Sequence, residues 1–265
     1  MTLRLVLVGW GAIATEVARV LDARGAGVVL AGIALRDPGR AQGLPPGVPV
    51  LTDPAGLSAL APDLVVEAAG RAAVLPWGVA ALATGADFAP ASTSAFADPA
   101  VLPALVAAAQ AAGRQVIVPP GALGGVDALA AAARLPLTHV RHEIVKPPAA
   151  WAGTGADALC DLAALPGPVA FFEGTAAEAA ARFPQNANVA MITALAGIGP
   201  DRTTVALVAD PGAARNRHRV VAEGDFGRME IVLENLPLAA NPKTSALTAL
   251  SLVRLVENRA GPLSV

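Results

Sequence analysis

Cysteine, histidine and charged residues are all scarce in this chain of 265 residues. The single cysteine, Cys160, has no partner for an internal disulfide, so we expect it to be a small buried residue in a reducing compartment. Charged residues make up 15% of the chain, hydrophobic residues make up 54%, and the formal net charge is -2. Because there is no basic excess, nucleic acid is not an expected partner.

Apolar segments of the kind that cross membranes are also missing. The long uncharged stretch 183–200 contains prolines, asparagines and glycines, all of which disfavour a membrane-spanning helix. The apolar run 3–8 is short, and glycines and charged residues follow it, which indicates a buried strand rather than a signal peptide. We therefore expect a soluble, cytoplasmic protein with no membrane partner.

Histidine and lysine are few enough to be considered one by one. Of the three histidines, His218 ends a run of polar residues, which is either a surface loop with an incidental histidine or part of a catalytic site. His139 and His142 lie within a strand pattern, so we expect structural roles for both. Lysine occurs only at Lys146 and Lys243, where an ammonium group is required or where two lysines persist by chance.

Strand and helix patterns alternate through residues 1–120. Continuous apolar runs indicate strands covered on both faces, and the longer stretches between them indicate helices. The expected strands are 3–8, 28–35, 64–67, 87–91 and 115–118, and the expected helices are 12–24, 72–84 and 100–112. This alternation predicts an α/β domain with a doubly wound parallel sheet, in which 38–56 is a Pro/Gly-rich connection.

The pattern changes in residues 121–240. Five expected strands lie close together, and one helix that begins near Ala190 interrupts them. The strands are 139–145, 169–173, 203–209, 218–223 and 228–233, with a tight turn at 224–227. We expect an α+β domain with a mostly antiparallel sheet. The final segment, about 241–265, is expected to be a helix, beginning near Ser245, that packs back on the first domain.

A glycine-containing turn joins the first expected strand to the first expected helix. In Gly9-Trp10-Gly11-Ala12-Ile13-Ala14, the first glycine permits the turn and the second lets a pyrophosphate approach the backbone. The helix N-terminus supplies N–H groups and the positive end of a dipole, and Ala14 is tolerated as the third small residue. The turn therefore predicts a dinucleotide site with contacts from Gly9, Gly11, Ala12 and Ile13.

The ends of later strands extend this predicted site. Arg36 ends the second strand and suits the 2'-phosphate of NADP, whereas Asp37 suits the ribose hydroxyl of NAD, so either cofactor is expected. A solvated loop charge is the alternative for Arg36. Ala69 and the segment 92–94 follow other strands at the carboxyl edge, where ligands of such sheets bind. The glycine-rich loop 119–125 permits close approach to the nicotinamide end.

Five polar segments in the second half complete a pattern of motifs. They are Lys146-Pro147-Pro148, 183–190, Arg215-Asn216-Arg217-His218, Glu234-Asn235-Leu236-Pro237 and Asn241-Pro242-Lys243-Thr244-Ser245. Each alone is typical of a turn or a helix cap. Together with the two glycine loops, in this order, they resemble the L-aspartate dehydrogenase family over nearly the whole chain.

That resemblance implies an activity and a set of residues. The family oxidises L-aspartate to iminoaspartate with NAD or NADP; the imine hydrolyses to oxaloacetate and ammonia, and the reverse reaction is a reductive amination. Iminoaspartate can feed NAD biosynthesis. The resemblance implies a Rossmann domain and an α+β domain that binds substrate and dimerises. It implies that His218 is catalytic and that Ala122 and Asn188 contact NAD.

The chemistry of these side chains also suits the proton transfer, cofactor contact and carboxylate binding that the reaction needs. His218 can take a proton from the substrate amine or activate the water that attacks the imine, and the sequence leaves both open. Asn188 could orient the carboxamide, or it could simply cap a helix. The two substrate carboxylates need cations or hydroxyls, for which the candidates are Lys146, Lys243, Thr244 and Ser245. No metal site is expected.

Two other functions are compatible with a dinucleotide-binding chain. One is another two-domain NAD(P) oxidoreductase, of the homoserine dehydrogenase or dihydrodipicolinate reductase type. The other is a protein that senses NAD(P) without turnover. A sensor requires no chemistry at His218, and the other reductases do not account for the set of polar segments in the second half.

Overall fold

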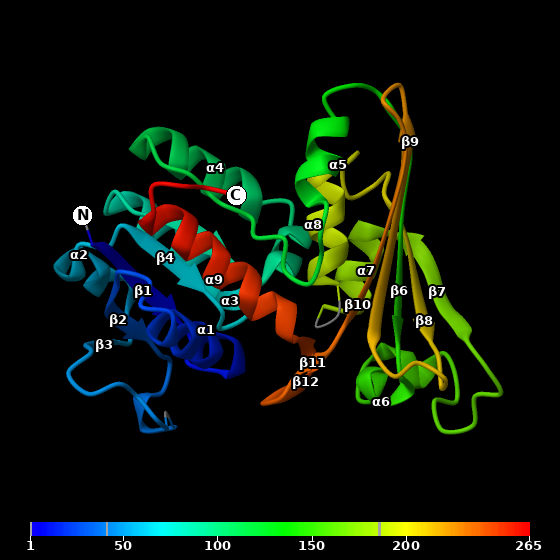
Figure 1. Cartoon of the computed structure of the whole chain (residues 1–265), viewed down its shortest axis with the longest axis horizontal. Helices are drawn as coiled ribbons and strands as arrows, with labels where there is room; N and C mark the ends of the chain where they lie inside the picture. Colours follow the sequence, from blue (N-terminus) through cyan, green and yellow to red (C-terminus); the bar gives the residue numbers. More distant parts are fainter. Residues whose placement is uncertain (1, 41, 185–186) are drawn as a thin grey trace. The chain divides into compact units, whose positions relative to one another are not determined.

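A computed structural model describes residues 2–40, 42–184 and 187–265 of the chain. The chain forms two compact units (Figure 1), one of residues 1–119 with 249–265 and one of residues 120–248. Each unit has its own sheet and its own helices, and each is described by itself below. In the part of the chain that the structure describes, no helix is long and apolar enough to cross a membrane.

The first unit is built on a parallel sheet of five strands. These are β1 (Leu3–Val8), β2 (Val28–Ala34), β3 (Val50–Leu51), β4 (Leu64–Glu67) and β5 (Asp87–Pro90), in the order β3-β2-β1-β4-β5. All four pairings are parallel. The prediction of a doubly wound parallel sheet is confirmed. Strands are added to one side of β1 and then to the other, so the strand order reverses between β1 and β4, where such sheets bind ligands.

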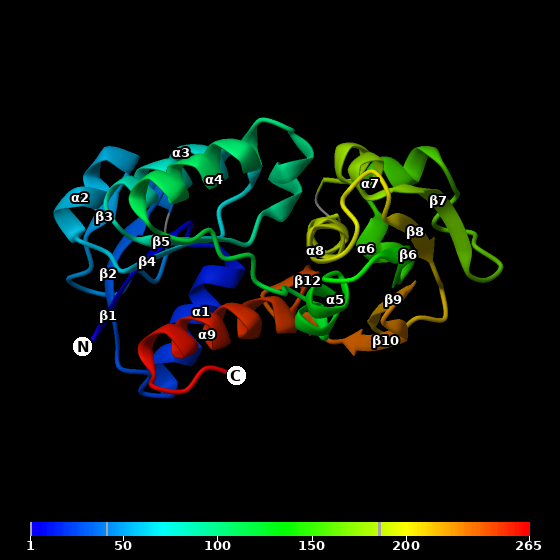
Figure 2. The ribbon, with the colours of Figure 1, turned by 90° about the horizontal axis from the view of Figure 1, so that it is seen from above.

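Helices cover both faces of this sheet. They are α1 (Ala12–Ala23), α2 (Leu57–Leu60), α3 (Arg71–Ala83), α4 (Val101–Ala112) and α9 (Ala246–Ala260), with short 3-10 turns at 38–40, 54–56 and 93–97. Figure 2 shows α3 and α4 on one face and α1 and α9 on the other. The buried side chains of α9, which recur at helical spacing, pack into the core that Leu5, Leu7 and Val17 form. They are Ala249, Leu252, Val253 and Val256.

Three details of the predicted elements were wrong. The expected strand 115–118 makes only a single bridge, between Val116 and Phe88. Ile117 donates to the Phe88 carbonyl, but Pro90, the next residue that could bond along the ladder, has no N–H group. The connection 38–56 contains the short strand β3, and residues 241–245 form a strand rather than the start of the final helix.

The second unit contains a mixed sheet with mostly antiparallel pairing. Its strands are β6 (Leu137–Lys146), β7 (Val169–Thr175), β8 (Thr204–Ala209), β9 (Asn216–Gly224) and β10 (Gly227–Asn235), in the order β10-β9-β6-β8-β7. Only the β6–β8 pairing is parallel. The predicted α+β domain with a mostly antiparallel sheet is thus confirmed. A separate pair, β11 (Pro237–Leu238) and β12 (Asn241–Ser245), follows it.

One face of this sheet is covered by helices, and the side chains of β6 on its two faces differ in burial. Its helices are α5 (Val126–Ala132), α6 (Pro148–Trp151), α7 (Ala176–Arg182) and α8 (Asn188–Ala196), with a 3-10 turn at 155–158. Figure 1 shows α5, α7 and α8 together on one face. Residues of β6 alternate, so that His142, Ile144 and Lys146 are buried while Arg141 and Glu143 are half-buried.

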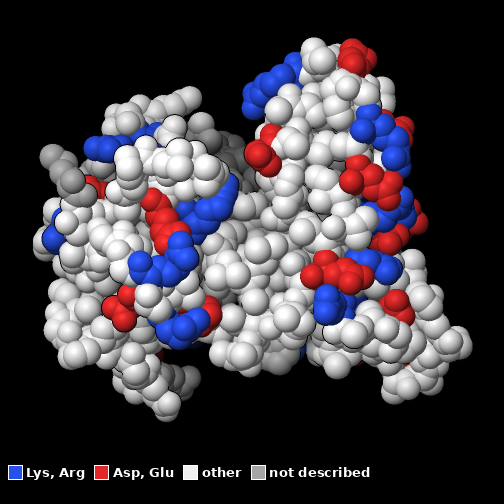
Figure 3. Space-filling model, viewed as in Figure 1, with Lys and Arg blue, Asp and Glu red and all other residues white. Residues whose placement is uncertain are grey.

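Acidic and basic side chains are interleaved on the surface of the second unit, at the right of the view in Figure 3. Arg141 pairs with Glu173, and Arg219 and Arg228 both pair with Glu230.

Candidate functional site

The turn between β1 and α1 requires glycine at its first position. Gly9 has a φ of 96°, which disfavours any residue with a side chain. A Cβ atom at Gly9 would lie 2.9 Å from the backbone atoms of Ala68 and Ala69. The Gly9 N–H also donates to the Ala34 carbonyl oxygen at 2.8 Å. The first predicted glycine therefore lets the β1–α1 turn pack directly against the turn that follows β4.

The second glycine lies at an open position. Gly11 is the N-cap of α1 and has no side-chain capping bond, and a Cβ atom there would meet nothing within 4 Å. Ala12 and Ile13 form the first turn of the helix, whose N–H groups have no partner within the helix. Ala14, the third small residue, is buried in the core. This exposed helix N-terminus fits the pyrophosphate of a dinucleotide.

A pocket of about 470 Å³ opens beside this turn. Gly9, Arg36 and Ala69, three of the residues predicted to bind the cofactor, line it together. Arg71 lines the same pocket and was missed by the sequence analysis. It is the first residue of α3, directly after the glycine that ends the β4 turn, and its position there was the only signal. The pocket thus has two guanidinium groups that can bind a phosphate.

The buried carboxylate of Glu67 organises the same edge of the sheet. Its Oε1 accepts hydrogen bonds from the N–H groups of Ala69 and Gly70, both at 2.7 Å. It also accepts the Ser92 hydroxyl at 3.0 Å, and Oε2 accepts the Ser92 N–H at 3.1 Å. Burial raises the pKa of Glu67, and these hydrogen bonds oppose the shift. Glu67 therefore joins the turns after β4 and β5.

In the second unit, His218 lies inside the fold rather than in a surface loop. It belongs to β9, where it pairs with Ile144 of β6, and it is 2% exposed. Its Nδ1 is 3.2 Å from Nε2 of His142, which is also fully buried, and Nδ1 of His142 is 2.9 Å from the Thr193 hydroxyl. His142, for which a structural role was expected, thus contacts the candidate catalytic residue. His139, by contrast, is exposed.

The buried ammonium group of Lys146 is the second chemical feature of this region. Lys146 ends β6, on the face that carries His142, and its Nζ lies 5.1 Å from the ring centre of Trp151. Burial lowers the pKa of Lys146 to about 8. The Trp151 Nε1–H donates to the Val208 carbonyl oxygen at 2.9 Å, which fixes the ring.

Burial also keeps both histidines neutral. Burial lowers the pKa of His142 to about 3. The pKa of His218 lies well below its ordinary value, first because of burial and then because of His142 and the charge of Lys146. At neutral pH His218 is therefore an uncharged imidazole with one nitrogen that can accept a proton.

The glycine-rich loop before α5 is held by a residue of β10. Asn235 is buried, and its Nδ2 donates to the carbonyl oxygen of Ala122 at 2.8 Å. Gly125 has a φ of 66°, and a Cβ atom there would lie 2.2 Å from Ile231. Asn235 was not predicted as a site residue, although it belongs to a polar segment that the sequence singled out. Its contact sets the position of Ala122.

Asn188 begins α8 but does not cap it. The N-cap is Ala187, without a side-chain hydrogen bond. Asn186, the other asparagine considered as a cap, lies outside the described residues. Asn188 is half-buried and belongs to the same helix as Thr193.

The three candidates on β12 have different environments. Lys243 is exposed, and its Nζ donates to the Ala152 carbonyl oxygen at 3.4 Å, next to Trp151. Ser245 is buried, and its hydroxyl oxygen accepts the Leu247 N–H at 3.3 Å, as a cap of α9 does. Thr244 is half-buried.

Similarity to known proteins assigns the chain to a family. Residues 127–259 match the family model described as aspartate dehydrogenase, C-terminal. Over 256 residues the chain is 56% identical to an L-aspartate dehydrogenase from Brucella anthropi, and the match covers 96% of each protein. The chain belongs to the aspartate dehydrogenase family.

Two further findings agree with this assignment. An L-aspartate dehydrogenase from Ruegeria pomeroyi is 45% identical over 258 residues, which cover 97% of this chain and 92% of that protein. The crystal structure of aspartate dehydrogenase from Thermotoga maritima has 27% identity and a TM-score of 0.81, with 100% of both chains covered. Residues 9–119 match a model of the NAD binding domain of homoserine dehydrogenase. The resemblance to the L-aspartate dehydrogenase family is confirmed.

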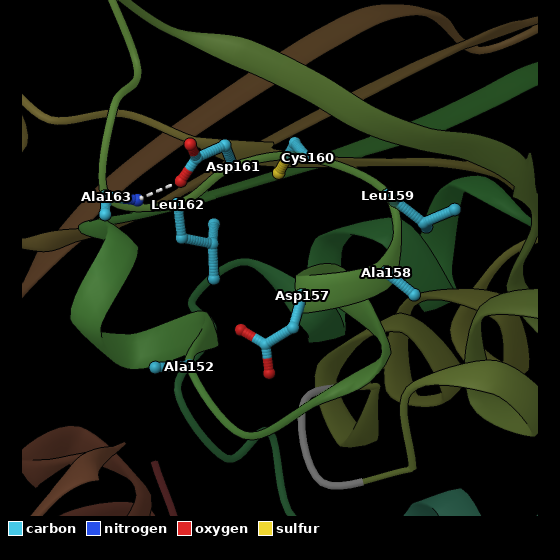
Figure 4. Close-up of a pocket in the computed structure, with 8 residues that line it drawn as sticks. All are labelled: Ala152, Asp157, Ala158, Leu159, Cys160, Asp161, Leu162 and Ala163. Atoms are coloured by element: carbon cyan, nitrogen blue, oxygen red, sulfur yellow. Dashed lines mark hydrogen bonds between the residues drawn. The ribbon is translucent and has the colours of Figure 1, made fainter.

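In this aspartate dehydrogenase family member, Cys160 is not the buried residue that the sequence suggested. It is partly exposed and lines a pocket (Figure 4) with Asp157 and Asp161. Burial and the two neighbouring carboxylates raise the pKa of its thiol, which makes it a poor nucleophile. We assign no chemical role to this cysteine.

Proposed function

We propose that the chain catalyses the NAD(P)-dependent oxidative deamination of L-aspartate. The products are iminoaspartate, NAD(P)H and a proton, and water converts the imine to oxaloacetate and ammonia. The observation that carries this proposal is the 56% identity to the Brucella anthropi L-aspartate dehydrogenase along almost the entire chain. The reverse reaction, a reductive amination, uses the same residues.

The first unit suits the dinucleotide. The open helix N-terminus at Gly11 fits a pyrophosphate, with Gly9, Ala12, Ile13 and Ala69 around it. Arg36 is the residue that would meet the 2'-phosphate of NADP. In the second unit, Ala122 and Asn188 are proposed to contact the nicotinamide end. When bound, the nicotinamide ring accepts the hydride from the substrate Cα.

The proposed proton acceptor is His218. A neutral, buried imidazole can remove a proton from the substrate ammonium group, which must lose its charge before the hydride leaves. The same nitrogen can instead take a proton from the water that attacks the imine. A bound dicarboxylate would offset the charge of Lys146 and make His218 a stronger base.

The proposed partners of the two substrate carboxylates are cations and hydroxyls of the second unit. Lys146 is the best supported, because its buried ammonium shares a strand face with His142 and influences His218. Lys243, Thr244 and Ser245 are the further candidates, together with the Asn188 amide and His218 itself. The capping contact of Ser245 leaves its hydroxyl proton to donate to a carboxylate.

The assembly, the location and the metabolic setting of the protein are proposed as well. A homodimer is proposed from the family resemblance, and sedimentation velocity would test it. A cytoplasmic location is consistent with a single unpaired cysteine. A link to NAD biosynthesis follows from the product iminoaspartate.

The test is NADH or NADPH oxidation with oxaloacetate and ammonia, repeated with His218→Ala. We expect ammonia-dependent turnover in the wild type, and a kcat about a hundredfold or more lower in the variant. Cofactor binding, followed by fluorescence, serves as the control and should persist. Turnover that does not depend on ammonia would point to another reductase, and binding without any turnover would point to a sensor.

A further inference from the structure

A chain of three hydrogen bonds leads from the candidate base to the backbone of a helix. His218 Nδ1 lies 3.2 Å from His142 Nε2, and His142 Nδ1 lies 2.9 Å from the hydroxyl of Thr193. The same hydroxyl lies 3.1 Å from the carbonyl oxygen of Val189, one turn earlier in α8. All three side chains are at most 2% exposed, so water does not compete for these contacts.

The carbonyl at the end of the chain determines the direction of every bond in it. The carbonyl oxygen of Val189 can only accept, so in its contact with Thr193 the hydroxyl is the donor and uses its single proton there. The Thr193 oxygen must then accept, which requires a proton on Nδ1 of His142. Because a neutral imidazole carries one proton, Nε2 of His142 has a lone pair.

The same reasoning extends to the next ring. The lone pair of His142 accepts the proton of His218 Nδ1, which leaves Nε2 of His218 without a proton. Had the Thr193 hydroxyl pointed to His142 instead, both bonds of His142 would reverse, and Nε2 of His218 would carry a proton. That arrangement would leave the Val189 carbonyl without the hydroxyl proton.

We propose that His142 and Thr193 are positioning residues that hold His218 in the tautomer protonated at Nδ1, so that Nε2 is ready to accept a proton. This inference rests on the proposed role of His218 as the base. After the transfer, both nitrogens of His218 carry protons, and Nδ1 still donates to the lone pair of His142. The ring keeps its orientation throughout, as a histidine held by a carboxylate does.

A neutral partner differs from a carboxylate in one respect. A carboxylate would stabilise the imidazolium and raise the pKa of the base, whereas the neutral His142 orients the ring without that charge. Burial disfavours the imidazolium of His218, and the charge of Lys146 on β6 disfavours it further. His142 and Thr193 therefore orient the His218 ring, and the carboxylates of the bound substrate would supply the negative charge that favours its imidazolium.

The direct test is the tautomer of His218, measured by nitrogen NMR of the imidazole in the full-length protein. The wild type should show Nδ1 protonated and Nε2 unprotonated at neutral pH. In Thr193→Val, which keeps the shape and removes the hydroxyl, His142 loses its acceptor, so the population of the opposite tautomer should rise. A wild-type His218 protonated at Nε2 would overturn the proposal. This measurement does not depend on turnover, so its failure is distinct from failure of the proposed reaction.

Kinetics provide the second readout. Thr193→Val should lower kcat roughly ten- to a hundredfold with little change in the KM for the dinucleotide, and Thr193→Ser should restore most of it. His142→Gln places an amide near the Nε2 position and should retain more kcat than His142→Leu. Thermal unfolding of each variant separates loss of fold from loss of position. Equal kcat values in Thr193→Val and the wild type, with an unchanged tautomer, would refute the inference.

Discussion

At the scale of single residues, the surroundings of a side chain decide what its chemical type can do. His218 stands out in the sequence as one of three imidazoles, yet its properties come from burial and from two neighbours, His142 and Lys146. Arg36 is a cation at a strand end, and the pocket adds Arg71, whose only local signal is its place after Gly70 at the start of α3. Both arginines are exposed, so their effect on anions is moderated by solvent.

Cofactor preference should depend on Arg36 more than on any other arginine of the first unit. Replacing Arg36 with Ala should raise the KM for NADPH about tenfold and leave that for NADH nearly unchanged, because only NADPH carries a 2'-phosphate. Arg71→Ala should show a weaker effect of the same sign. Steady-state kinetics with both cofactors provide the measurement. The exposed Arg114 offers a matched control, and an equal change for both cofactors in Arg36→Ala would contradict the assignment.

At the scale of elements, the close approach of the β1–α1 turn to the β4–α3 turn explains why glycine is required at position 9 but not at position 11. The β1–α1 turn meets the β4–α3 turn at Gly9, whereas Gly11 faces open space. The hydrogen bonds of Glu67 draw the turns after β4 and β5 together in the same region. Strand pairing is also decided locally, since Pro90 ends the ladder that residues 115–118 would otherwise have extended.

Alanine at the first glycine should therefore mainly reduce stability, and alanine at the second should mainly weaken dinucleotide binding. Gly9→Ala forces a clash with backbone atoms at a positive φ and should cost about 2 kcal/mol or more of unfolding free energy. Gly11→Ala should change stability by less than about 1 kcal/mol but weaken dinucleotide binding, because its methyl group occupies the open space. Urea denaturation and cofactor titration test the pair. Equal loss of stability in both would be incompatible with this geometry.

At the scale of the whole molecule, buried neutral groups make stability depend on pH. The unfolded chain protonates His142 below pH 6.5, whereas the folded chain keeps it neutral down to about pH 3. The unfolded state therefore binds more protons in this window, and the free energy of unfolding falls as the pH is lowered through it. Lys146 acts with the same sign between about pH 8 and 10.5. Glu67, whose pKa is raised, opposes the trend near its own pKa.

The expected result is a loss of stability between pH 6.5 and 4 that is steeper in the wild type than in His142→Gln. One buried neutral histidine contributes at most about 1.4 kcal/mol per pH unit, so the two slopes should differ by up to that amount. Urea denaturation at several pH values measures both, and because Glu67 is present in each protein its contribution cancels. Parallel slopes would show that His142 is protonated in the folded chain.

By itself, the sequence determined the features that depend on neighbours along the chain. The glycine turn at 9–14, the alternation of strands and helices and the hairpin at 224–227 follow from local periodicity and turn chemistry. The family resemblance and the catalytic role expected of His218 also follow from the residues alone. These features need no knowledge of distant contacts, because a turn or a strand is specified within about ten residues.

Only the tertiary structure decided the features that depend on residues far apart in the chain. His142 meets His218 across 76 positions and Thr193 across 51, and Asn235 reaches Ala122 across 113. Burial shifts the pKa values of these histidines, and the carbonyl of Val189 sets the direction of their hydrogen bonds. The pKa shifts and the hydrogen-bond directions both depend on which groups are buried together away from solvent. The pairing of β6 with β9, with Thr193 of α8 against His142, brings these groups together.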